Sequence, residues 1–151
     1  MVRFDREVLQ GFINPGSFLQ STGVELLSRD GAVSVVPYRQ IKAVCFVKDW
    51  DGPTVLDERR EFLGRPKNAG LWIQVRFRDG DTLEGTVAND LLLMDPAGVT
   101  FVPPEANGNS QKVFSPREAL VSVAVLGVVG SPLRRRKPAA AVEQINLFNE
   151  D

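Results

Sequence analysis

Histidine is absent from the 151-residue chain, and cysteine occurs once. Without histidine the chain lacks the commonest general base, the usual activator of serine and cysteine nucleophiles, and the usual zinc ligand. Cys45 has no partner for an internal disulfide and lies in the apolar run 43–47, so we expect an inert, buried thiol. We therefore expect no enzymatic activity, no metal site and no cofactor.

Long hydrophobic runs and a strong charge of one sign are also missing. The charged start and the lack of an apolar span of about 20 residues predict neither a signal peptide nor a membrane helix. We expect a cytoplasmic protein without membrane contact. Because 18 basic residues stand against 19 acidic ones, binding of nucleic acid would need a local basic patch.

Turn residues and short alternating segments are plentiful and predict a mostly β fold. Residues 24–28 and 32–36 flank Arg29-Asp30-Gly31, and residues 71–77 and 82–87 flank Asp79-Gly80. An Asp-Gly pair between apolar segments is a strong hairpin signal. Further strands are expected at 43–47, 91–94, 99–102, 113–114 and 120–126, with 91–94 and 99–102 forming a third hairpin.

Composition divides the chain into five segments. Residues 1–50 are expected to form an N-terminal arm and a three-stranded β unit, and residues 51–70 a polar loop or insertion. Residues 71–128 are expected to form a small barrel. A basic linker at 129–143 and a terminal docking peptide at 144–151 complete the predicted organisation.

Two stretches share one spacing, in which a proline is followed at the fourth, seventh and ninth positions by apolar residues. The stretches are Pro37-Ile41-Val44-Phe46 and Pro116-Leu120-Val123-Val125. In each, the spacing predicts a strand end, about one helical turn and a new apolar strand. Because this pattern is common in small β folds, we expect ordinary turn chemistry rather than an internal duplication.

Residues 75–87 consist of a strand, an Asp-Gly turn and a second strand broken by Gly85, followed by Asn89-Asp90. This segment resembles the first motif of the Sm-like family, and the proline-led turn before Leu120 is similar to the bridge between that family's last two strands. The resemblance implies an Sm-like or SH3-like small barrel. We expect the N-terminal hairpin unit to pack on this barrel and the C-terminal tail to be flexible. The resemblance also implies binding of RNA or single-stranded nucleic acid, or self-association through edge strands into a homo-oligomer.

The whole chain resembles an uncharacterised bacterial domain family that has no established activity. The resemblance rests on five short segments: Val36-Pro37-Tyr38, Ile41-Lys42-Ala43-Val44, Arg65-Pro66-Lys67, Gly70-Leu71-Trp72 and Phe77-Arg78-Asp79-Gly80.

The polar segment contains a candidate nucleic-acid strip, formed by Arg59, Arg60, Arg65 and Lys67 with Phe62 and Trp72 nearby in the sequence. In such a strip, cations follow phosphates while aromatic rings stack on bases. The alternative is a set of ordinary surface charges. An acidic cluster in the same segment, Asp49, Asp51, Asp57, Glu58 and Glu61, is expected to be solvated rather than to hold a cation.

The C-terminal segment carries the clearest functional signal. Arg134, Arg135, Arg136 and Lys137 predict a hydrated, extended linker able to contact phosphates. Gln144-Ile145-Asn146-Leu147-Phe148 resembles the peptide with which bacterial proteins bind the DNA sliding clamp. The resemblance implies that Gln144 hydrogen-bonds in one subsite and that Leu147 and Phe148 fill an apolar pocket, supported by Ile145. The alternative is that the peptide packs on the barrel.

Overall fold

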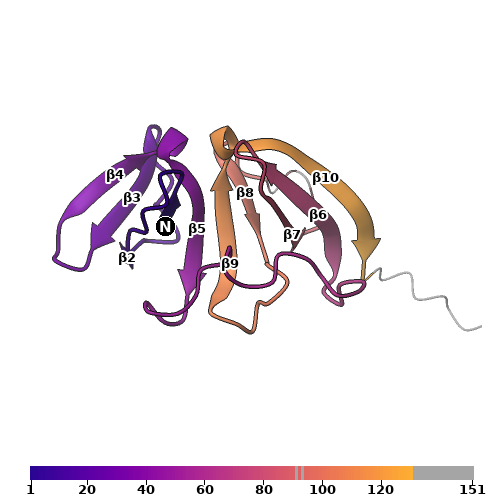
Figure 1. The fold of residues 1–151 in the computed structure, drawn as a ribbon. Helices are drawn as coiled ribbons and strands as arrows, with labels where there is room; N and C mark the ends of the chain where they lie inside the picture. Colours follow the sequence, from indigo (N-terminus) through magenta and orange to yellow (C-terminus); the bar gives the residue numbers. More distant parts are fainter. Residues whose placement is uncertain (91, 93, 131–151) are drawn as a thin grey trace, which may run out of the picture.

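The computed structural model describes residues 1–90, 92 and 94–130. Short strands make up nearly all of the regular secondary structure in the described chain (Figure 1). Its elements are β1 (Val2–Arg3), β2 (Gly11–Phe12), β3 (Gly23–Ser28), β4 (Val33–Pro37), the 3-10 helix η1 (Tyr38–Gln40), β5 (Ile41–Val47), β6 (Gly70–Phe77), β7 (Thr82–Val87), β8 (Gly98–Phe101), β9 (Ser110–Pro116), the 3-10 helix η3 (Arg117–Ala119) and β10 (Leu120–Val129). The prediction of a mostly β fold is confirmed.

The strands form three antiparallel sheets with the orders β1-β5-β9-β8, β10-β6-β7 and β2-β3-β4. A bridge joins the first two sheets, because Thr86 and Val102 exchange two backbone hydrogen bonds of 3.0 and 2.9 Å. Neither 3-10 helix is long or apolar enough to cross a bilayer, nor is any other helical turn in the described part of the chain.

Both predicted Asp-Gly hairpins are present, as β3-β4 and β6-β7. Gly31 and Gly80 adopt φ angles of 93° and 94°, in the left-handed region that glycine occupies without steric cost. In each turn an aspartate also accepts a backbone hydrogen bond, Asp30 from the N–H of Ala32 and Asp79 from the N–H of Asp81. Local turn chemistry therefore sets these two hairpins.

The segment β3-β4-η1-β5 is repeated as β8-β9-η3-β10. Gly23 lies opposite Pro37 at the start of the first hairpin, and Gly98 lies opposite Pro116 in the second. In both copies the proline is followed by one turn of 3-10 helix, closed by the N–H of the first residue of the next strand. Figure 1 shows the two turns side by side at one end of the molecule.

The repeat extends to the turns that follow β1 and β6. The N–H of Arg3 donates to the carbonyl of Glu7, as the N–H of Phe77 donates to that of Asp81. Arg6, at φ 71°, holds the left-handed position that Gly80 holds in the second turn. The chain is thus a structural duplication, contrary to our expectation, and we call residues 1–47 the first unit and residues 70–129 the second unit.

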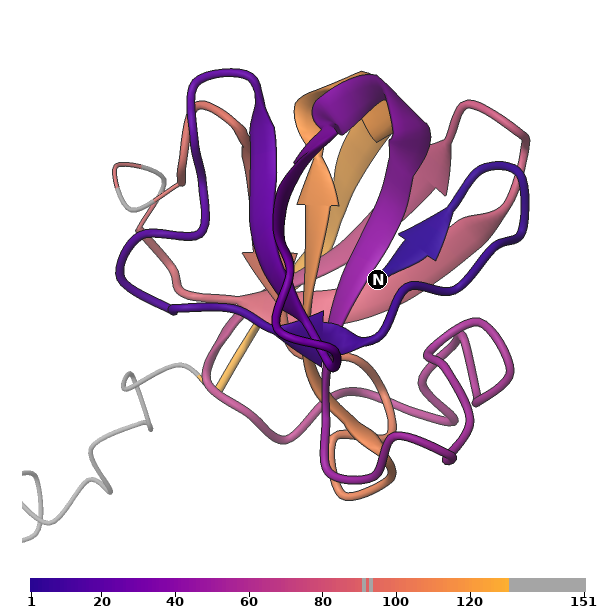
Figure 2. The ribbon, with the colours of Figure 1, turned by 90° about the vertical axis from the view of Figure 1, so that its left-hand side faces the viewer.

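The two units share their hydrophobic cores, because β5 and β9 pair along the middle of the molecule (Figures 1 and 2). On β9, Val113 belongs to the buried cluster of the second unit and Phe114 to that of the first. On β5, Ala43 and Val44 are divided between the clusters in the same way. Each unit therefore completes the core of the other.

The predicted self-contained barrel over 71–128 is not formed, since none of the three sheets closes on itself. β9 takes β5 of the first unit as its second neighbour, and β10 pairs only with β6 among the described strands. The core around β6 and β7 also includes Ala43 and Val55, from outside the predicted boundaries.

The partner found for β8 among the described strands is β9, and Leu92 and Met94 of the predicted hairpin belong to no strand. The predicted polar loop 51–70 has the expected irregular backbone, but Val55 within it is fully buried. Most of the predicted linker and all of the terminal peptide lie outside the described residues.

Candidate binding surfaces

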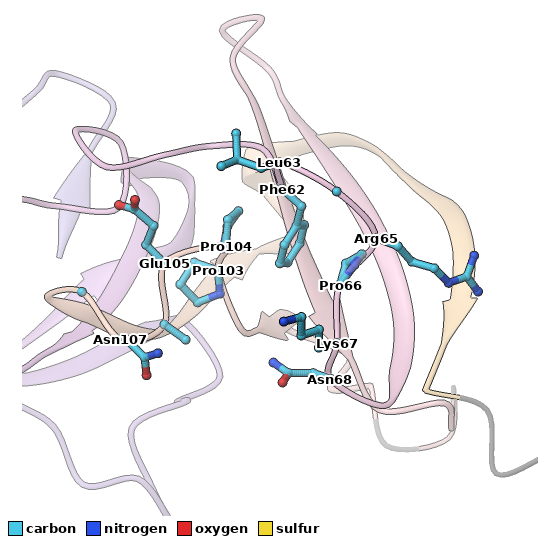
Figure 3. Close-up of a pocket in the computed structure, with 13 residues that line it drawn as sticks. Phe62, Leu63, Arg65, Pro66, Lys67, Asn68, Pro103, Pro104, Glu105 and Asn107 are labelled. Atoms are coloured by element: carbon cyan, nitrogen blue, oxygen red, sulfur yellow. The ribbon is translucent and has the colours of Figure 1, made fainter. Parts of the chain in front are cut away.

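The polar loop between β5 and β6 lies at the same end of the molecule as the tip of the β8-β9 connection (Figure 2). Residues 62–68 and 103–108 line a groove of about 670 Å³ between these loops (Figure 3). Phe62, Pro66, Pro103 and Pro104 supply its apolar walls.

Glu84 of β7 fixes the loop against the second unit. Its carboxylate, almost fully buried, accepts hydrogen bonds from the N–H of Phe62 at 3.1 Å and from the indole N–H of Trp72 at 2.9 Å. The N–H of Glu84 in turn donates to the carbonyl of Arg60 at 2.8 Å. The Phe62 and Trp72 rings meet edge to face with centroids 6.3 Å apart. The two aromatic residues are thus held by a buried carboxylate.

Asn109 fixes the beginning of the loop. Its side-chain amide donates to the carbonyls of Asp49 and Pro53 at 2.9 and 3.0 Å, and its backbone N–H donates to Glu58 at 3.0 Å. Asp57 closes a local turn with the hydroxyl of Thr54 at 2.9 Å. Several of the predicted cluster's carboxylates therefore act as hydrogen-bond acceptors, and the described residues contain no group of three metal-ligating side chains.

The structure does not gather the four predicted basic residues of the loop into one strip. Arg59 lies 3.9 Å from Glu105, and Arg60 lies 3.4 Å from Asp81 on another side of the loop. Arg65 turns away from the groove and donates to the carbonyl of Val128 (Figure 3). Lys67 lies in the groove with Phe62, as Figure 3 shows. Only Lys67 and Phe62 retain the predicted combination of cation and aromatic ring in one place.

Lys42 is the centre of a charged cluster where the two units meet. Its side chain extends from β5 and is 6% exposed, and its ammonium group donates to Asp79 at 2.5 Å and to Asp81. The hydrogen bond from Lys42 is the main cause that lowers the pKa of Asp81; burial opposes it, and the charge of Lys42 and the nearby Arg60 lower the pKa further. Sequence reasoning missed this role, although a single lysine within the apolar segment 41–47 was a signal for it.

Cys45 lies on the same strand, half-buried beside the core of the second unit. Burial raises the pKa of its thiol, so the thiolate that reacts with oxidants is disfavoured. The raised pKa agrees with the expectation of low reactivity, although the side chain is half-buried rather than buried as expected.

The outer edge of the second unit is an apolar surface. The ten residues of β10 include no charged side chain, and Val121, Val125 and Val128 are exposed. A second groove, of about 580 Å³, runs beside the first half of this strand and is lined by Met94, Val99, Leu120 and Val123, among others. The sequence predicted a strand here but not its exposure.

The remaining predicted site residues lie outside the described part of the chain. These are the basic residues Arg134, Arg135, Arg136 and Lys137, and the peptide residues Gln144, Ile145, Leu147 and Phe148.

The sequence was compared with protein families, curated proteins and solved structures. Residues 1–127 match the model of a family of unknown function (DUF6982). The chain belongs to this family. No curated protein and no solved structure matches it. The matched DUF6982 segment covers the first unit and all but the last two residues of the second, and the basic linker residues and terminal peptide lie beyond it.

Proposed function

We propose that this DUF6982 protein is a non-catalytic adaptor that docks on the DNA sliding clamp through Gln144-Ile145-Asn146-Leu147-Phe148. The observation that carries the proposal is the sequence of this peptide. It fits the clamp-binding pattern of glutamine, an aliphatic residue, a small or polar residue, leucine and phenylalanine at all five positions. Leu147 and Phe148 supply the apolar anchors and Gln144 the polar one, an arrangement in which few residues provide most of the binding energy.

The basic residues before the peptide support the same proposal. Arg134, Arg135, Arg136 and Lys137 precede Gln144 by a few residues, so a docked peptide would bring them near the DNA that passes through a clamp. Their contacts with phosphates add a salt-sensitive contribution to affinity. We also propose that the second unit is related to the Sm-like family. In support, it contains the Asp-Gly hairpin and the proline-led turn on which that resemblance rests.

The experiment is a titration of purified clamp with a peptide of residues 141–151. We expect saturable binding, and a loss on the order of several kcal/mol when Leu147 and Phe148 are both replaced by alanine. Asn146→Ala is the matched control and should bind as the native peptide does. The native peptide failing to saturate would contradict the proposal, as would a loss of several degrees in Tm when the full chain carries the double substitution.

A second candidate function is weak binding of single-stranded nucleic acid in the loop groove. The observation in its favour is that Lys67 and Phe62 line one groove of about 670 Å³. Stacking on a ring and a salt-sensitive contact with phosphate would then act together. Lys67→Ala should weaken binding of a labelled single-stranded oligonucleotide, and the weakening should diminish as salt rises. The same affinity for Lys67→Ala and the unmodified chain would exclude this groove.

A further inference from the structure

Strands β10 and β4 each have a neighbouring strand on one side only, although Arg65 donates to the carbonyl of Val128 near the end of β10. β10 pairs only with β6, and β4 pairs only with β3, within the described part of the molecule. Neither strand carries a charged residue. Soluble proteins usually protect edge strands with lysine, with charges that point inward or with a covering segment. Two uncharged open edges therefore indicate that both strands pair with something else.

The duplication identifies the partner. Within one chain, the last strand of the first unit, β5, pairs with the strand before the 3-10 turn of the second unit, β9. The equivalent of β5 is β10 and the equivalent of β9 is β4, the two strands described above. We propose that β10 of one copy pairs antiparallel with β4 of a second copy, so that chains assemble head to tail. This proposal does not depend on clamp binding.

The internal pairing also predicts the register between copies. Val44 lies opposite Phe114, and Phe46 lies opposite Lys112. Because 79 positions separate Pro37 from Pro116, a residue of β5 corresponds to the residue 79 positions later in β10, and a residue of β9 corresponds to the residue 79 positions earlier in β4. Val123 should therefore lie opposite Val35 of the second copy, and Val125 opposite Val33.

A groove is already present where Val35 would enter. In the first unit, Phe114 belongs to a buried cluster with Val24 and Val44. Val123 is the equivalent of Val44, and Val99 is the equivalent of Val24 because each follows the glycine, Gly98 or Gly23, that faces the proline. Val99 and Val123 both line the open groove of about 580 Å³ beside β10. Val35 is the equivalent of Phe114 and is 44% exposed in the single chain. The groove thus corresponds to the space that β9 fills within the molecule.

The charge pattern agrees with an apolar joint between copies. In the internal joint, Lys42 reaches Asp79 and Asp81 of the second unit. The equivalent of Lys42 is Val121, which is 66% exposed. The carboxylates in the corresponding turn of the first unit, Asp5 and Glu7, are bound by Arg3 of the same chain at 3.3 and 2.6 Å. In the joint between copies, Val121 would therefore stand in the place of Lys42, and the carboxylates that it meets would already be paired with Arg3.

Blocking each edge separately tests the proposal on the full-length protein. Val125→Lys blocks β10 and Val33→Lys blocks β4, and both side chains are more than half exposed, so each variant should fold. We expect the unmodified chain to exceed the 16.6 kDa monomer mass in light scattering, and each variant to be a monomer. Leu63→Lys, at an exposed loop residue, is the matched control and should assemble as the unmodified chain does.

Mixing the variants tests the direction of assembly. Each variant keeps one intact edge, so an equimolar mixture of Val125→Lys and Val33→Lys should form a dimer of twice the chain mass. A mixture that stays monomeric would overturn the head-to-tail arrangement. Assembly by Val33→Lys alone would also overturn it, because it would indicate that β10 pairs with another β10. An unmodified chain that is monomeric at all concentrations would overturn the proposal too. Assembly that occurs only after residues 131–151 are removed would also overturn it, because it would indicate that those residues occupy the edge in the full-length protein.

Discussion

Gly98 illustrates how one residue permits a close approach between strands. A Cβ atom at this position would lie 2.2 Å from the carbonyl oxygen of Ser115 and 2.9 Å from the ring of Phe114. Gly23 stands at the equivalent place in the first unit, with the carbonyl of Val36 at 2.0 Å from such an atom. Neither the backbone nor the buried ring can move freely, so both positions require glycine.

Gly98→Ala should therefore lower the free energy of unfolding by about 2–3 kcal/mol, as expected for overpacking in a filled interior. Chemical denaturation followed by tryptophan fluorescence would measure the loss. Gly64→Ala is the matched control, because no atom lies within 4 Å of a Cβ at that position. Equal stability of the two variants would contradict the close approach.

Asp81 gives a prediction for acid stability. Because Lys42 lowers its pKa in the folded protein, the ionised carboxylate contributes stability above the pKa of the unfolded chain, and this contribution is lost as the pH falls through the lowered folded value. Asp81→Asn should thus cost stability near pH 7 and little at pH 2–3. We expect less than about 1 kcal/mol, since the side chain is 40% exposed and screened by water.

Urea unfolding of both proteins across this pH range would provide the test. Asp51→Asn is a suitable control, since Asp51 has no ion-pair partner among the described residues and its substitution should leave the pH profile unchanged. A stability difference for Asp81→Asn that does not vary with pH would argue against the ion pair.

At the scale of elements, the polar loop depends on the buried carboxylate of Glu84. Glu84→Ala would leave the N–H of Phe62 and the indole N–H of Trp72 without their acceptor. We expect a loss of about 2–3 kcal/mol, because buried donors would be left unsatisfied. Amide hydrogen exchange in residues 61–68 should also become faster.

Glu84→Gln serves as the control because it retains one side-chain oxygen of nearly the same geometry. It should lose less stability than Glu84→Ala and protect residues 61–68 better. Unchanged exchange in Glu84→Ala would mean that other contacts hold the loop.

At the scale of the whole molecule, the shared cores predict one cooperative unfolding transition. Phe114 of the second unit is buried in the first, and Ala43 of the first unit is buried in the second. Neither unit can therefore unfold without exposing the core of the other. Differential scanning calorimetry should give a van't Hoff enthalpy equal to the calorimetric one. Two separate transitions, or a stable monomeric fragment of residues 70–130, would disprove this coupling.

The sequence by itself determined the local features of this protein. The two Asp-Gly turns, the strands beside them and the 3-10 turns after Pro37 and Pro116 were all predictable, because each depends on residues a few positions apart. The apolar neighbours of Cys45 also predicted its place against the core. Even the duplication left a trace in the proline spacing, but equivalent residues such as Arg6 and Gly80 differ too much for the sequence to reveal it.

Only the tertiary structure decided how the strands pair and where the loop charges lie. Several apolar strands offer similar edges, so the sequence could not show that β9 takes β5 as its neighbour and leaves β10 open. The pairing is decided by packing, since Phe114 and Ala43 each fill the other unit's core. Likewise, Arg59 and Arg60 are adjacent in sequence but reach different carboxylates, because an irregular loop has no period that fixes side-chain direction.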